Sequence, residues 1–213
     1  VKKIVTVNNY QDALDEATKL GYPVIIRSVL PKSSSTRKIV HDRSELADAV
    51  KACLSQSRAE QVVVQQSLAG YKEIEVVVQR DSSGTMMMLS MIEDMDPIGI
   101  HAGDSIAFNP VQTLRDRQIQ DIRDTAFRKL RIVGTNHIQF ALDTNSDRFY
   151  VIKSSPYFDR ITAFVSQSTG YPIAQVTAQL YAGKHLRDID LGENYVHHAA
   201  LIEPTMDHIA ARV

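Results

Sequence analysis

Residues 28–38 place hydroxyl and basic side chains directly after a short apolar run, in an arrangement that could bind phosphate. The run "YPVII" ends at Arg27, and the chain continues as "SVLPKSSSTRK". Serine hydroxyls and the cations Lys32, Arg37 and Lys38 are able to attract an anion. A loop that approaches phosphate closely usually contains glycine, which lets the backbone come near and adopt positive φ. No glycine occurs here, so the stretch is either an anion site without a fitted cradle or, as we slightly favour, a solvated loop.

Four further stretches carry residues suited to phosphoryl transfer. They contain Glu73 in "GYKEIEVVVQRD", His101 in "GIHAGDS", Gln139 in "NHIQFALD" and Arg160 after "KSSPYFD". Phosphoryl transfer depends on cations that hold phosphate oxygens, and Mg²⁺ prefers oxygen ligands. Each residue also has a plain structural explanation: a solvated strand residue, a structural histidine, an amide satisfied within a sheet, or a surface cation.

Composition limits the classes of protein. The chain has 213 residues, with 44% apolar and 23% charged residues and a net charge of −1. These values are ordinary for a globular protein and give no electrostatic reason to expect nucleic acid or a membrane as partner. The single Cys53 has no partner for an internal disulfide, and no signal peptide is visible. We expect a cytoplasmic protein and, because the chain starts without Met, a domain of a longer chain.

Hydrophobic periodicity and capping residues predict alternating helices and strands. A capping box is expected at Asp42 and Glu45, and "DSSG" predicts a hairpin turn. In chain order the predicted elements are a helix at 9–20, a strand at 23–27, a helix from 42 to 54, strands at 61–68, 72–81 and 85–94, a loop at 94–112, a helix from Thr113 to Ile132, strands at 136–143 and 149–155, and helices at 161–170 and 172–183.

This order predicts an α+β fold with antiparallel strands rather than a doubly wound parallel sheet. The residues from His185 onward are less regular and include His197 and His198. Adjacent histidines without a cysteine or carboxylate at ligand spacing are usually solvated, so we assign them no metal.

Several stretches, in this order, resemble one family: "GYPVIIR", "SLAGYKEIEVVVQRD", "IEDMDPIGIHAGDS", "PVQTL", "NHIQFALD" and "STGYPIAQVTAQLYAG". They resemble the amino-terminal, carboxyphosphate-forming ATP-grasp domain of the large chain of carbamoyl-phosphate synthase. The resemblance implies an ATP-grasp fold in which two α+β subdomains with mainly antiparallel sheets clasp a nucleotide cleft. We expect a smaller subdomain at 1–66 with the phosphate-loop position at 28–38, a larger one at 67–190, and a tail at 191–213 leading towards the next domain.

The resemblance also implies an activity. Members of the family are ATP-dependent ligases, in which bicarbonate attacks the γ-phosphate of ATP to give carboxyphosphate. Carboxyphosphate leads through carbamate to carbamoyl phosphate, which is used for arginine and pyrimidine synthesis. The expected cofactors are ATP and Mg²⁺ or Mn²⁺. The expected partners are the nucleotide, bicarbonate, the remainder of the large chain and a glutaminase small subunit.

Site residues follow from the resemblance, position by position. Arg27 and Arg160 match catalytic arginines that face the phosphates and bicarbonate, and Gln139 matches a metal-binding glutamine. The nucleotide-binding positions are Arg27, Gln66, Leu68, Glu73, Gly99, Ile100, His101 and Gln139.

The chain departs from the family pattern at the expected metal ligands. Where the family has Glu-Met-Asn-Pro-Arg, this chain has "KSSPY", so that Lys153 and Ser155 occupy the ligand positions and Tyr157 replaces an arginine. Gln66 replaces a glutamate that anchors adenine, and the phosphate loop has lost its glycines. We therefore expect a degenerate copy with impaired chemistry. The alternatives are a structural or nucleotide-sensing module and, less favoured, a ligase for another acid.

Overall fold

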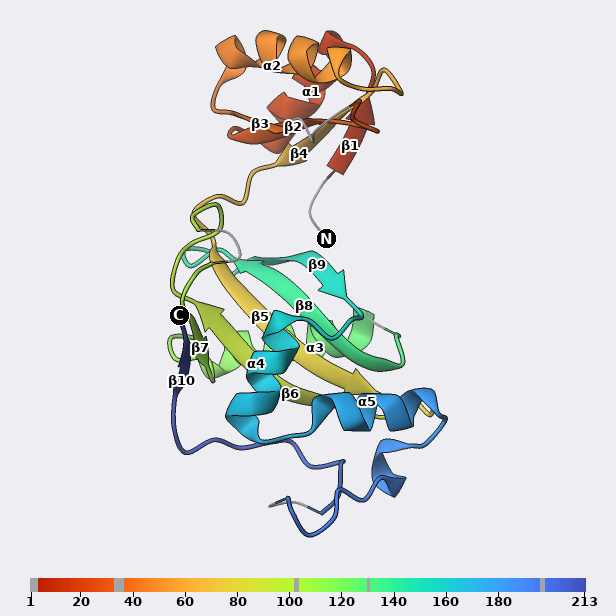
Figure 1. Ribbon diagram of the computed structural model, residues 1–213. Helices are drawn as coiled ribbons and strands as arrows, with labels where there is room; N and C mark the ends of the chain where they lie inside the picture. The colour runs from red at the N-terminus through yellow and green to blue at the C-terminus, as the bar shows by residue number, and fades with distance from the viewer. Residues whose placement is uncertain (1–3, 33–36, 102–103, 130, 196–197) are drawn as a thin grey trace. The chain divides into compact units, whose positions relative to one another are not determined.

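Every strand pair in the described part of the chain is antiparallel. The computed structural model describes residues 4–32, 37–101, 104–129, 131–195 and 198–213. The chain divides into two compact units, Val1–Leu68 and Ala69–Val213, which we call unit 1 and unit 2. Each unit has its own sheet and helices (Figure 1). The predicted α+β architecture with antiparallel sheets is confirmed.

Unit 1 is a four-stranded sheet with two helices on one of its faces (Figure 1). The strand order is β1-β4-β2-β3. The elements are β1 (Ile4–Val7), α1 (Tyr10–Leu20), β2 (Val24–Ser28), β3 (Arg37–Val40), α2 (Arg43–Ser55) and β4 (Val62–Gln66).

Local signals in the sequence explain where the two helices of unit 1 begin. The side chain of Asn9 accepts a hydrogen bond from the backbone of Asp12 at the start of α1. Asp42 caps α2 as predicted, because its carboxylate accepts from the backbone N–H groups of Ser44 and Glu45. The Glu45 carboxylate reaches back to the N–H of His41 rather than to that of the cap. Both helices then bury apolar side chains against the sheet.

Unit 2 is a six-stranded sheet in the order β10-β7-β6-β5-β8-β9. The elements are β5 (Lys72–Arg80), β6 (Met86–Asp94), β7 (Ala107–Asn109), α3 (Asp116–Lys129), β8 (Gly134–Leu142), β9 (Phe149–Ser155), α4 (Arg160–Thr169), α5 (Ile173–Tyr181), a 3₁₀ helix (Leu186–Asp188) and β10 (Ala210–Arg212).

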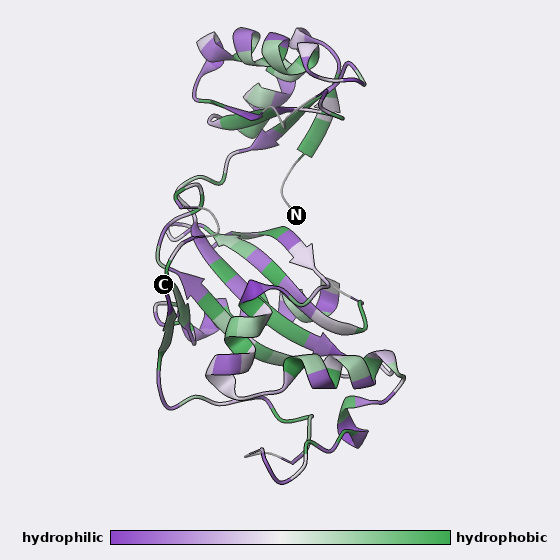
Figure 2. Ribbon diagram, viewed as in Figure 1, coloured by the Kyte–Doolittle hydropathy of each residue, from purple (hydrophilic) through white to green (hydrophobic). Residues whose placement is uncertain are grey.

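The sheet of unit 2 is covered on both faces. Successive residues of β5 alternate between two cores: Val77 packs with α4 and α5, whereas Val76 and Val78 pack with α3. Hydrophobic and hydrophilic segments alternate along the central strands (Figure 2). The polar residues at the amino-terminal end of β5, Glu73 and Glu75, lie on the same face as Val77 because side chains alternate with a period of two. The face that carries α4 therefore also carries these acids.

The structure corrects several predicted boundaries. Arg37 and Lys38 are not loop residues; they belong to β3, which pairs with β2. Strand β1 was not predicted, β7 lies within the predicted loop at 94–112, and β10 lies in the predicted tail. Residues 33–36 of the phosphate-loop position, Ala102 and Gly103 of "GIHAGDS", and His197 lie outside the described residues.

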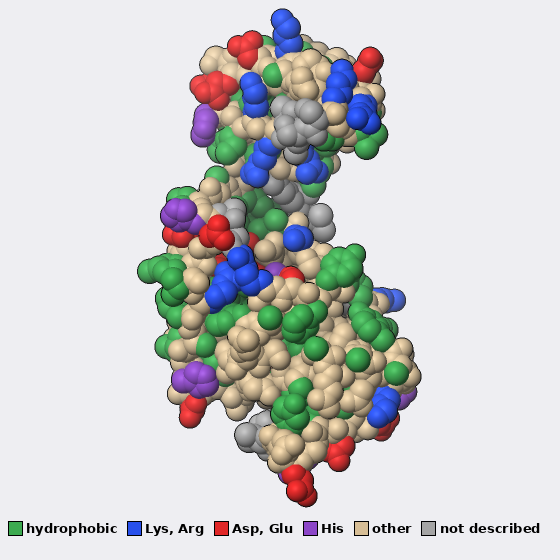
Figure 3. Space-filling view, viewed as in Figure 1, with side chains coloured by type: hydrophobic (Ala, Val, Ile, Leu, Met, Phe, Trp, Pro, Cys, Tyr) green, Lys and Arg blue, Asp and Glu red, His purple; other side chains and the backbone are tan. Residues whose placement is uncertain are grey.

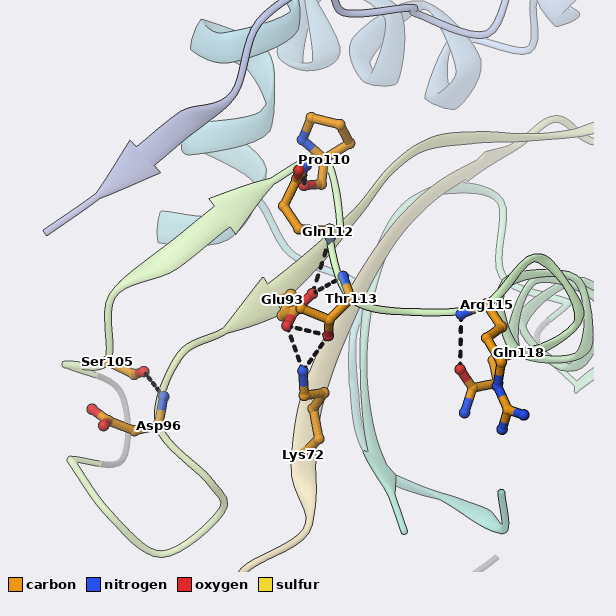
Figure 4. A network of polar contacts seen from close by, with 9 residues as sticks. All are labelled: Lys72, Glu93, Asp96, Ser105, Pro110, Gln112, Thr113, Arg115 and Gln118. Atoms are coloured by element: carbon orange, nitrogen blue, oxygen red, sulfur yellow. Dashed lines mark hydrogen bonds and ion pairs between the residues drawn. The ribbon is translucent and has the colours of Figure 1, made fainter. Parts of the chain in front are cut away.

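Thr113 does not cap α3, which begins three residues later at Asp116. The Thr113 hydroxyl donates to Glu93 instead, at 2.6 Å, and its backbone N–H donates to the same carboxylate at 3.0 Å. Lys72 contacts both residues (Figure 4). A buried carboxylate thus competes successfully for the hydroxyl that the sequence pattern assigns to the helix. Within the described residues, no helix is both long and apolar enough to cross a bilayer.

Candidate functional site

A cavity of about 220 Å³ opens in unit 2 on the face of the sheet that carries α4. Side chains from β5, β6, β8, β9, α4 and β10, together with the loop after β6, line it. Six of the residues singled out from the sequence meet here: Glu73, Ile100, His101, Gln139, Lys153 and Arg160. They come from positions up to 87 residues apart (Glu73 to Arg160), so the fold brings them together.

The other predicted residues lie elsewhere. Arg27, Gln66 and Leu68 belong to unit 1, where Arg27 is exposed and Leu68 is buried. Gly99 belongs to the loop after β6 and has a φ of +101°, a conformation that favours glycine. Ser155 is buried at the end of β9 and is not one of the residues that line the cavity.

The loop after β6 is closed at its base by hydrogen bonds. Met95 N–H donates to the carbonyl of Ile106 at 2.8 Å, and Asp96 N–H donates to the Ser105 hydroxyl at 3.0 Å (Figure 4). The Asp96 carboxylate lies 3.0 Å from Nδ1 of His101. These contacts hold the loop at the edge of the cavity, although His101 itself is largely exposed.

Three carboxyl groups form an acidic cluster in the cavity wall. Glu73, Glu75 and Asp94 each offer an oxygen within 4.8 Å of the other two. Glu75 and Asp94 are buried. Burial and the neighbouring Glu75 and Glu73 raise the pKa of Asp94 to about 8, and burial followed by Glu75 also raises that of Glu73. Three carboxyl groups this close cannot all be ionised unless a cation lies among them; otherwise at least one of them holds a proton.

His137 connects the acidic cluster to helix α4. Its Nδ1 lies 2.7 Å from the Asp159 carboxylate, and its Nε2 contacts the carboxylate of Glu75. The side chain of His137 is only 4% exposed. Burial disfavours the charged imidazole, but the hydrogen bonds to Asp159 and Glu75 outweigh burial and raise the pKa of His137 to about 9. The cavity therefore has an imidazolium built into its wall at neutral pH.

Asp159 has two structural tasks. One carboxylate oxygen caps α4 by accepting from the N–H groups of Ile161 and Thr162, at 3.1 and 3.0 Å. The other accepts from His137. Burial acts to raise the pKa of Asp159, but these hydrogen bonds prevail and lower it to about 2. Because Arg160 follows directly in the first turn of α4, this anchor fixes where the arginine backbone lies at the cavity.

The cavity does not fit a metal ion at the ligand positions that the sequence resemblance indicates. Gln139 lies opposite Glu75 on one side and Lys153 on the other, so the three side chains share a face. An ammonium group offers only donors and repels a divalent cation at contact distance. The groups that could hold a cation are instead Glu73, Glu75 and Asp94, on the other side of Gln139.

Sequence reasoning missed half of this arrangement. The cavity residues that it did not single out are Glu75, Asp94, Ser105, His137, Asp159, Ile161 and Arg212. A signal was available for Glu75, because it lies two residues from Glu73 and a strand places both on one face. Asp94 and His137 lie within the quoted motifs, but no local pattern connects them or Arg212 to the site, since only the strand order of the sheet brings their elements side by side.

Solved structures identify the fold. The chain resembles biotin carboxylase from Campylobacter jejuni in its beta-gamma-ATP complex, with a TM-score of 0.68 and 18% identity over 87% of this chain and 44% of that one. It also resembles the biotin carboxylase domain of 2-oxoglutarate carboxylase from Hydrogenobacter thermophilus, in complex with MgADP, ADP and bicarbonate. There the TM-score is 0.67 and the identity 15%, over 88% and 43% of the two chains. The fold is that of the ATP-grasp proteins, as predicted.

Sequence comparison narrows this class to one family. Residues 2–189 match the family described as carbamoyl-phosphate synthase L chain, ATP binding domain. The arginine-specific large chain of carbamoyl phosphate synthase from Lactiplantibacillus plantarum is 38% identical over 211 residues, which is 98% of this chain. The chain belongs to the family of ATP-binding domains of the carbamoyl-phosphate synthase large chain. It spans about a fifth (21%) of the length of that relative.

Proposed function

We propose that this chain is the nucleotide-binding, carboxyphosphate-forming domain of a carbamoyl-phosphate synthase large chain, in a form impaired in phosphoryl transfer. Family membership and the ATP-grasp fold support the nucleotide and the ligase reaction. The arginine-specific relative favours a role in arginine synthesis over pyrimidine synthesis. The expected partners are the rest of the large chain and a glutaminase subunit.

The observation that carries the proposed impairment is Lys153 in the cavity wall beside Gln139. Mg²⁺ supplies charge neutralisation and geometry to phosphoryl transfer when it bridges the phosphates. A lysine supplies one positive charge on a flexible stem without that bridging geometry. The residues of this chain that can neutralise an anion in the cavity are Lys153, Arg160 and Arg212. This set suits binding of a phosphate or bicarbonate better than acceleration of transfer.

The test is bicarbonate-stimulated ATP hydrolysis with Mg²⁺, combined with restoration of the missing ligands. We expect the unchanged chain to hydrolyse ATP slowly, with only a weak stimulation by bicarbonate. The double variant Lys153→Glu, Ser155→Asn should gain about tenfold in nucleotide affinity when Mg²⁺ is added, because carboxylate and amide oxygens are ligands that Mg²⁺ accepts. Calorimetry with and without Mg²⁺ measures this gain.

The matched control is Lys153→Ala, which removes the ammonium without providing a ligand and should show no gain with Mg²⁺. Robust bicarbonate-stimulated turnover by the unchanged chain would contradict the proposed impairment. A double variant that is as indifferent to Mg²⁺ as the control would show that the metal seat is not at Lys153 and Ser155.

A second function is favoured by the same residue: a structural or nucleotide-sensing module within the large chain, without chemistry of its own. Lys153 can hold a nucleotide phosphate without a metal, and such binding is sufficient for a sensor but not for a ligase. The two functions differ in turnover, whereas both sensor and ligase require nucleotide binding.

A further inference from the structure

Two arginines face each other across neighbouring strands of unit 1. Arg27 of β2 and Arg37 of β3 are direct partners in the antiparallel pair, as are Ile25 and Ile39 two residues further along. Directly opposed residues project from the same face of a sheet with neighbouring Cβ atoms. Both guanidinium groups therefore project from one face, beside an isoleucine pair.

This face is the one without helices. Val24 and Ile26 of β2 belong to the core formed with α1 and α2, so Arg27, which alternates with them, lies on the opposite face. Both arginines are exposed. No hydrogen bond or ion pair joins either side chain to another of the described residues. Lys and Arg side chains are prominent on the visible surface of unit 1 (Figure 3).

Opposed like charges are destabilising in a sheet unless a counter-ion lies between them. Two guanidinium groups together present parallel N–H donors that match the oxygens of phosphate groups. From this pairing we propose that Arg37 acts with Arg27 as a two-arginine site for a polyphosphate, and that the site works without a divalent cation. The sequence resemblance assigns a phosphate role to Arg27 only; Arg37 occupies a position where the family has glycine.

The two-arginine site deepens the proposed function. It rests on that function in one respect, namely that the polyphosphate belongs to a nucleotide. The anion site itself stands on unit 1 alone. In the family, glycine backbone and metal share the work of neutralising the phosphates. Here a second arginine would take over part of that charge, consistent with the loss of the metal ligands at Lys153 and Ser155.

Lys38 provides a matched control next to Arg37. It is paired with Ile26, whose side chain lies in the core under α1 and α2, so Lys38 projects from the helix-bearing face. Burial raises the pKa of the Cys53 thiol in α2 and the charge of Lys38 acts against that rise, which agrees with this placement. Lys38→Ala thus removes the same charge from the adjacent position of the same strand, but on the other face.

The experiment is titration of the full chain with inorganic triphosphate and with ATP, each in EDTA and in Mg²⁺. We expect triphosphate to bind in EDTA and the affinity to fall as salt rises. Arg37→Ala should weaken triphosphate binding about tenfold or more, because a charge-assisted bidentate contact is lost. Lys38→Ala should weaken it less than threefold. Arg37→Lys keeps the charge but loses the paired N–H donors of the guanidinium group, so its affinity for triphosphate should lie between those of the two alanine variants.

Equal losses in Arg37→Ala and Lys38→Ala would overturn the proposal, since they would indicate only general electrostatic attraction. Binding that requires Mg²⁺ would overturn it as well. If triphosphate binds through Arg37 but ATP does not, the proposed nucleotide function fails and the anion site stands. If ATP binds and Arg37→Ala has no effect on either ligand, the anion site fails alone. Thermal unfolding confirms that each variant is folded, and Arg37→Lys replaces Arg37→Ala if the latter is not.

Discussion

Cationic side chains and carboxyl groups share the wall of the cavity in unit 2. Lys153, Arg160 and Arg212 face the carboxyl groups of Glu73, Glu75 and Asp94, while His137 bridges Glu75 and Asp159. Burial strengthens the interactions among Glu75, Asp94 and His137, because the effective dielectric constant falls, whereas Lys153 and Arg160 are exposed. The effect of a substitution that changes charge therefore depends on the neighbouring side chains from other strands. For Lys153, these neighbours are the cations and acids of the same cavity wall.

Asp94 makes the stability of unit 2 depend on pH. Its folded-state pKa of about 8 lies above the ordinary value of 3.8, so the folded state holds the proton longer. Stability from this group is complete below about pH 4 and is lost as pH rises through about 8. His137, raised from 6.5 to about 9, acts in the same direction between those values. Asp94→Asn should remove the Asp94 part, so this variant gains more stability relative to the parent at pH 8.5 than at pH 5.

Urea unfolding of both proteins at the two pH values measures this difference. Asp104→Asn is the matched control, because Asp104 is close to the cavity but its side chain is 89% exposed. It should shift the unfolding midpoint equally little at both pH values. An Asp94→Asn variant whose stability changes by the same amount at pH 5 and pH 8.5 would contradict the raised pKa of Asp94.

At the scale of elements, the sequence predicts those with strong local signals. The long strands β5, β6 and β8 follow from their apolar alternation, and α2 follows from its cap at Asp42. β7 and β10 are only three residues long, too short for a periodic signal, and pair through contacts about 100 residues apart. β3 carries Arg37 and Lys38, charged residues that resemble loop residues until β2 supplies a partner.

Some residues of the candidate site have a local signal in the sequence, and others gain their significance only from the fold. Positions such as Glu73, Gln139 and Arg160 could be named because they lie within recognisable motifs. His137 lies in one of those motifs too, but its significance depends on Glu75 from β5 and Asp159 from the cap of α4. No local pattern connects residues of three elements.

The link between β7 and α3 depends on one buried carboxylate. Glu93 of β6 accepts from the backbone N–H groups of Gln112 and Thr113, both at 3.0 Å, and pairs with Lys72 of β5 (Figure 4). Its side chain is 7% exposed. Glu93→Gln would break the ion pair and turn an amide donor towards groups that need an acceptor. We expect the free energy of unfolding to fall by about 3 kcal/mol.

Urea denaturation followed by circular dichroism measures this loss. Asp124→Asn, which breaks the exposed pair between Asp124 and Arg128 within α3, is the control and should cost less than about 1 kcal/mol. If the two variants lost the same free energy, Glu93 would hold the segment no more firmly than an ordinary surface pair.

At the scale of the whole molecule, each unit closes a core of its own. The core of unit 1 draws on α1, α2 and one face of its sheet, and unit 2 has a core on each face. Each unit also exposes a separate group of cations suited to phosphate: Arg27 and Arg37 in unit 1, Lys153 and Arg160 in unit 2. Of these four cations, Arg37 and Lys153 are the two that the sequence resemblance predicts to stand where the family has a glycine or a metal ligand.

Nucleotide binding by the full chain tests what these substitutions achieve together. We expect ATP and AMP-PNP to raise the thermal unfolding temperature equally with and without Mg²⁺, because the cations rather than a metal hold the phosphates. A ligand at a hundred times its Kd stabilises the native state by about 2.7 kcal/mol, which corresponds to about 5 °C or more for a chain of this size. Adenosine at the same concentration, which lacks phosphates, should give a much smaller shift. No shift with any nucleotide would indicate a purely structural module, and a shift that appears only with Mg²⁺ would show that a metal seat survives despite Lys153.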